Sequence, residues 1–73
     1  MFSSYTHLRG MLSQGWRVEP PVYVRPRLHE RNDTYHFVLW NGDRVALVSV
    51  FGCPEIRRFL VEQNLSTDHL KSG

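Results

Sequence analysis

Apolar and polar residues alternate most regularly over residues 34–51, in two runs that flank Asn41-Gly42. Alternation over runs of this length predicts two half-buried β-strands. Asn-Gly between such runs is typical of a type I′ hairpin, in which both central residues need a positive φ. We therefore expect a two-residue turn at Asn41-Gly42, which places Phe37 opposite Ala46 and Tyr35 opposite Val48.

This register divides the hairpin into two faces of different character. The first face is almost wholly apolar and is predicted to be core. It comprises Tyr35, Phe37, Leu39, Ala46, Val48 and Val50. The second face is mixed, so it is either half-solvated or covered by something. It comprises Thr34, His36, Val38, Trp40, Asp43, Val45, Leu47 and Ser49.

Helical periodicity is found on both sides of the hairpin. Ser3-Ser4 supplies an N-cap for a first helix, which Gly15 ends in the left-handed conformation. Pro54 suits the first turn of a second helix, and Asn64 suits the position just after its end. The apolar stripes are Tyr5, Leu8, Met11 and Leu12 in the first helix and Ile56, Phe59 and Leu60 in the second. Residues 66–69 are expected to form one last helical turn.

Two alternating segments, residues 16–19 and 22–25, lie between the first helix and the hairpin. Pro20, Pro21 and Pro26 interrupt them, and prolines are excluded from central strands, so this strand is predicted at a sheet edge. The expected fold is a single α+β domain over residues 1–73, a two-layer helix–three-stranded antiparallel meander–helix. Its core should contain Tyr5, Leu8, Leu12, Phe37, Leu39, Val48, Val50, Ile56, Phe59 and Leu60.

Length and composition agree with a small folded domain. The chain has 73 residues, of which 41% are hydrophobic, and its nine aromatic residues argue against a disordered tail. No apolar run approaches the ~20 residues that a membrane span needs. The N-terminus lacks the pattern of a secretory signal, so a soluble, cytoplasmic protein is expected.

The mixed hairpin face is the first candidate for function. Trp40, Val38, Val45 and Leu47, with His36 beside them, present more apolar surface than a domain leaves in water. We expect this face, or an edge strand, to bind protein, either a second copy or a larger assembly. The alternative is that the Pro20-Pro21 segment or the tail covers the face.

Arginines suggest nucleic-acid binding as a second interpretation. The chain has eight arginines and one lysine, with a net charge of +2. Arg25, Arg27 and Arg31 are interleaved with Tyr23, as in a surface that tracks phosphates and stacks a base. Arg57 and Arg58 could extend this surface, although a solvated strand has a similar composition.

Catalytic and metal-binding motifs are scarce in the sequence. His36 could act as a general acid or base, with Thr34 and Ser49 as its nearest candidate partners, but a half-exposed strand histidine with no role is the preferred interpretation. The four histidines show no metal-ligand spacing, and no cofactor motif is present, so neither a metal nor a cofactor is expected. Cys53 near a helix start should have a lowered thiol pKa, or it serves only as a capping or buried residue.

The order of elements is similar to the double-stranded RNA-binding fold, and several short segments resemble HicA-type toxins, small ribonucleases of toxin–antitoxin pairs. The matching segments are residues 12–16, His36, residues 43–45 and residues 60–66. The resemblance implies a ribonuclease with His36 as its catalytic residue. The family's Gly-Ser-His run is absent, since Asp33-Thr34-Tyr35 precedes His36. A non-enzymatic binding module is therefore our leading expectation.

Overall fold

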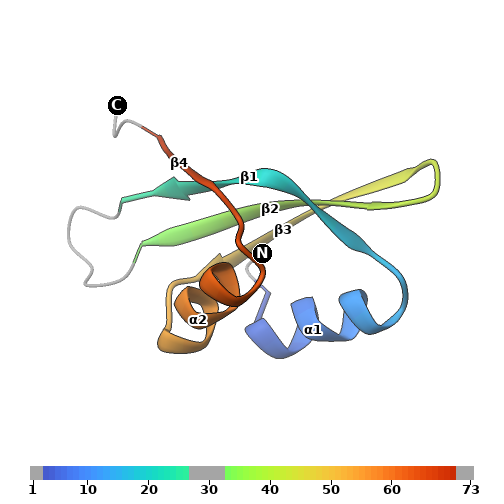
Figure 1. Cartoon of the computed structure of the whole chain (residues 1–73), viewed down its shortest axis with the longest axis horizontal. Helices are drawn as coiled ribbons and strands as arrows, with labels where there is room; N and C mark the ends of the chain where they lie inside the picture. The colour runs from blue at the N-terminus through green and yellow to red at the C-terminus, as the bar shows by residue number, and fades with distance from the viewer. Residues whose placement is uncertain (1–2, 27–32, 71–73) are drawn as a thin grey trace.

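The computed structural model describes residues 3–26 and 33–70 and combines two helices with a single four-stranded sheet. The elements in chain order are α1 (Tyr5–Ser13), β1 (Arg17–Arg25), β2 (Thr34–Asn41), β3 (Arg44–Phe51), α2 (Pro54–Glu62) and β4 (Thr67–His69). The strand order is β3-β2-β1-β4, and both helices lie on one side of the sheet (Figure 1). The expected two-layer α+β fold is confirmed, with one additional strand.

Both helices begin and end at the residues that the sequence indicates. The Ser4 hydroxyl accepts a hydrogen bond from the His7 N–H at 3.1 Å, which satisfies a free donor of the first turn. Gly15 has a φ of +99°, which lets the chain leave α1. Asn64, with a φ of +52°, does the same after α2.

The hairpin turn lies one residue later than predicted. Asn41 pairs with Arg44, so the two-residue turn is Gly42-Asp43, and Phe37 lies opposite Val48 rather than Ala46. Gly42 has a φ of +64°, whereas Asp43 is not in the positive region. These signs match a type II′ turn, which places glycine first and leaves Asn41 in the strand. The pairing therefore moves by two residues, and each side chain keeps its predicted face.

β1 is an interior strand, so its predicted position at a sheet edge is wrong. It lies between β2 and β4, and its pairing with β2 is irregular between Glu19 and Tyr23, where Pro20-Pro21 lies. Prolines are tolerated at such irregularities because no regular ladder bond is required of them.

The predicted last helical turn is instead β4, which pairs parallel with residues 22–24 of β1. The Val22 N–H donates to the Ser66 carbonyl at 2.9 Å, and the Leu70 N–H donates to the Val24 carbonyl at 2.8 Å. These bonds satisfy backbone groups of β1 that a sheet edge would leave open.

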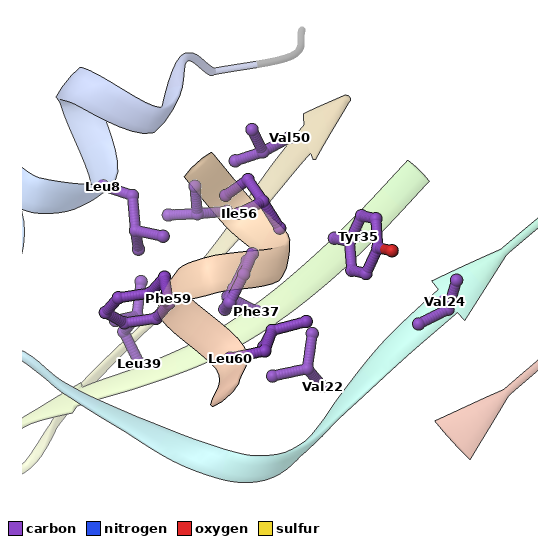
Figure 2. Packing of buried hydrophobic residues seen from close by; sticks show 11 residues of the cluster. Leu8, Val22, Val24, Tyr35, Phe37, Leu39, Val50, Ile56, Phe59 and Leu60 are labelled. Carbon is purple, nitrogen blue, oxygen red and sulfur yellow. The ribbon is translucent and has the colours of Figure 1, made fainter. Parts of the chain in front are cut away.

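The core fills the space between the helices and the sheet (Figure 2). Its buried side chains are Leu8, Val22, Val24, Tyr35, Phe37, Leu39, Val48, Val50, Ile56, Phe59 and Leu60. Phe59 is central, because its ring makes edge contacts with Phe37 at 6.3 Å and with Tyr5 at 6.1 Å between centroids. Tyr5 and Leu12, predicted as core, are only partly buried at its margin.

Candidate functional site: the open sheet face

The side of the sheet opposite the helices carries the predicted binding residues. Paired residues of neighbouring strands point to the same side, so the register assigns this face on each strand. We call it the open face: Arg17, Glu19, Tyr23 and Arg25 of β1, Thr34, His36, Val38 and Trp40 of β2, and Val45, Leu47, Ser49 and Phe51 of β3. Both helices lie on the other side (Figure 1).

An apolar patch occupies the β2–β3 half of the open face. Trp40 is 40% exposed, Val45 55% and Leu47 77%, while Val38 is half-buried. Trp40 lies opposite Val45, and Val38 lies opposite Leu47. Directly opposed side chains in an antiparallel pair are about 4.5–5.5 Å apart at Cβ, so these residues form one contiguous surface. The structure thus brings the predicted apolar residues together.

The Pro20-Pro21 segment and the tail are the two parts of the chain that the sequence suggests as covers of this face. In the described structure both lie elsewhere. Pro20-Pro21 belongs to β1 and lies in the sheet itself. The tail adds β4 beside β1, at the opposite end of the sheet from β3. Within residues 3–26 and 33–70, neither segment therefore covers the patch.

His36 lies next to the apolar patch, and its imidazole is hydrogen-bonded to Ser49 on the neighbouring strand. Its Nδ1 is 2.8 Å from the Ser49 hydroxyl oxygen on β3, and the two residues are directly opposed. Its Nε2 is buried and, among the described residues, has no hydrogen-bond partner. Burial lowers the His36 pKa below its usual value, and the positive charge of Arg25 lowers it further. The imidazole is therefore neutral at neutral pH.

The described arginines of the nucleic-acid hypothesis do not lie on one surface of the domain. Arg25 lies on the open face at the end of β1. Arg27 and Arg31 lie outside the described residues. Arg57 and Arg58 are exposed on α2, in the helical layer on the other side of the sheet.

Cys53 does not show the predicted lowering of its thiol pKa. It is the N-cap of α2 and is partly buried. Burial raises the Cys53 pKa, and this effect outweighs that of the nearby Ile56 backbone N–H, which acts in the opposite direction. A largely protonated thiol fits the structural interpretation of Cys53 as a partly buried residue; it occupies the N-cap position, but its side chain makes no capping hydrogen bond.

Two further features of the described residues concern function classes. No group of three or more histidine, cysteine, aspartate or glutamate side chains is placed to hold a metal ion. Neither described helix has the length and apolar character required to cross a membrane.

Sequence reasoning missed two features of the surface. A cleft of about 370 Å³ lies in the helical layer and is lined by Leu12, Trp16, Phe59 and Leu65 among others. Trp16 and Leu65 each lie just beyond a helix end. These two apolar residues are the one local feature of the sequence that points to the cleft. The second feature is the position of β3 at an edge of the sheet.

A comparison with models of protein families found no match, and searches of curated proteins and of solved structures found none either.

Proposed function

We propose that this chain is a small non-enzymatic binding module that contacts a protein partner through the open face. The observation that carries the proposal is the contiguous patch of Trp40, Val45 and Leu47 on the uncovered side of the sheet. Removing apolar surface from water stabilises a complex by about 25 cal/mol per Å² before the costs of association. Tryptophan is also among the residues enriched at binding hot spots.

The chemistry around the patch favours binding over catalysis. A general acid or base must present a nitrogen or oxygen to its substrate. The His36 Nδ1 is hydrogen-bonded to the Ser49 hydroxyl, and the His36 Nε2 is buried. The imidazole thus adds a side-chain contact between β2 and β3 next to the patch.

Photo-cross-linking in the cells that make the protein tests this proposal. The photoreactive residue p-benzoylphenylalanine replaces Leu47 in one variant and Val61 in the control. Val61 is 80% exposed on α2, so it matches Leu47 in exposure but lies on the other side of the sheet. We expect protein adducts from position 47 and far fewer from position 61. Equal yields at both positions, or no adduct at position 47, would contradict the proposal.

Nucleic-acid binding is the second candidate, because Arg17 and Arg25 flank Tyr23 on β1 and all three lie on the open face. Phosphate contacts make affinity fall steeply with salt, so titration of RNA and DNA at several salt concentrations tests it. Arg25→Gln should then reduce the salt slope by about one phosphate contact. Cleavage of RNA that His36→Ala abolishes would instead support a HicA-like ribonuclease.

A further inference from the structure

The outer edge of β3 has backbone groups that the sheet does not use. The Ser3 N–H donates to the Ser49 carbonyl from outside the sheet at 2.8 Å, so the backbone groups of Ser49 point outward. Backbone direction alternates along a strand, so those of Val45 and Leu47 point outward too. The two-residue turn agrees, because it makes Asn41 and Arg44 a hydrogen-bonded pair.

Val45 and Leu47 have no partner for these groups among the described residues, and β3 is otherwise a regular strand of eight residues. Edge strands are normally protected by brevity, charge, proline or a bulge. The opposite edge has such protection, since β4 has three residues and two of them are Asp68 and His69. No charged residue or proline occurs in β3 after Arg44.

We propose that two copies of this chain pair through their β3 edges, antiparallel, about a two-fold axis at Ala46. The inference rests on the proposed function, since it names the partner of the same surface. In this register Val45 of each copy forms a hydrogen-bonded pair with Leu47 of the other. The N–H and C=O of both residues are then all satisfied, and the sheet continues from one copy into the next.

Side chains and charges are compatible with this register. Val45 and Leu47 lie on the open face, so each meets an apolar partner across the axis, and the two apolar patches join. Arg44 lies opposite Val48 of the second copy. The two Arg44 residues are offset by four positions, about 13 Å at 3.3 Å per residue, which exceeds the Debye length of about 8 Å.

The size of the contact sets the expected affinity. A strand pair over residues 44–48 is smaller than the interfaces of about 1,200–2,000 Å² found in stable complexes. We therefore expect a reversible dimer with a Kd of about 1 μM to 1 mM. Sedimentation velocity over this range of protein concentration should show the weight-average mass rising toward twice the 8.6 kDa of the chain.

A disulfide across the axis tests the register directly. Ala46 faces Ala46 of the second copy in a non-hydrogen-bonded pair, where Cα atoms are about 4.5 Å apart, within the range of a disulfide. Ala46→Cys is therefore made in a Cys53→Ser background, and Val45→Cys in the same background is the control. The control position is opposite Leu47 of the second copy, so two control thiols do not face each other. Under mild oxidation we expect covalent dimer from Ala46→Cys, at least tenfold faster than from Val45→Cys. Equal rates, or no covalent dimer, would overturn the register.

A second pair of variants separates the edge from the open face. Leu47→Pro removes an outward N–H that the sheet does not use, whereas Leu47→Thr removes the same apolar side chain and keeps the N–H. If the chain dimerises by its edge, the proline variant sediments as a monomer at every concentration and the threonine variant still associates. Association of both variants, with far-ultraviolet circular dichroism confirming that each is folded, would overturn the edge pairing. If the adducts from position 47 contain another protein while the chain stays monomeric, the proposed function holds and the second-copy inference fails.

Discussion

Trp40 lies directly opposite Val45 across the β2–β3 pair, on the side of the sheet that neither helix covers. The neighbouring positions Leu47 and Val48 point to opposite sides of β3. Leu47 is 77% exposed, whereas Val48 is 4% exposed and belongs to the core. Substitution by glutamate should therefore change the stability of the chain very little at Leu47 and very strongly at Val48.

Leu47→Glu should change the free energy of unfolding by no more than about 0.5 kcal/mol, because it removes no buried contact. Val48→Glu should leave the chain largely unfolded, because it buries an unpaired charge in the core. Urea titration followed by circular dichroism measures both. A large loss of stability in Leu47→Glu would show that the open face is covered in the free chain.

Phe59→Ala removes the ring that joins α1, α2 and the sheet. We expect it to lower the free energy of unfolding by about 3–5 kcal/mol, much of the total for a domain of this size. Val61→Ala on the exposed side of the same helix is the control and should lie within about 0.5 kcal/mol of the parent. If Phe59→Ala melts near the parent temperature, α2 does not pack as described.

Two glycines should respond in opposite ways to substitution by alanine. Gly10 is in the middle of α1, and an added Cβ there meets nothing within 4 Å, so Gly10→Ala should stabilise by about 0.4–1 kcal/mol. At Gly52 an added Cβ would lie 2.9 Å from the Tyr35 ring and 3.0 Å from the Asp33 carbonyl oxygen. Gly52→Ala should therefore destabilise by about 1–3 kcal/mol. Thermal melts of both variants check the pair, and an equal shift of the same sign would contradict these contacts.

His36 should make stability depend on pH. Its pKa in the folded chain is lowered from 6.5, so the unfolded chain binds a proton first as the pH falls. The free energy of unfolding should thus be highest above pH 6.5 and decrease as the pH drops through 6.5 toward the folded pKa. His36→Gln should flatten this dependence of stability on pH, because it removes the group whose pKa is lowered. A parent stability that rises on acidification through this range would contradict the assignment.

The two faces of the hairpin were predictable, although the register was not. Alternation assigns Phe37 and Val48 to one side and Trp40 and Leu47 to the other, and a shift of two residues leaves those assignments unchanged. The choice between a turn at Asn41-Gly42 and one at Gly42-Asp43 depends on which positions adopt a positive φ. Either turn is compatible with a single Gly42 flanked by Asn41 and Asp43.

The order of strands could not be read from local pattern. Residues 67–69 carry no apolar alternation, because β4 is exposed and is held by backbone bonds to β1. If β4 is not anticipated, the prolines of β1 favour a position at the sheet edge. No residue of β3 indicates that β3 is itself an edge strand. Val22 and Val24 were missed as core for the same reason, since their burial follows from the interior position of β1.

The most direct test of the central claim combines the photoreactive residue at position 47 with Trp40→Glu. Trp40 is only two-fifths exposed, but the opposite face of the sheet holds the core, so this variant should remain folded. The measurement is the yield of protein adducts, taken at a temperature below the unfolding midpoint of both chains. If the open face is a protein-binding surface, a charge at position 40, within the patch, reduces the yield of adducts at least tenfold. An unchanged yield from a folded Trp40→Glu chain would contradict the account.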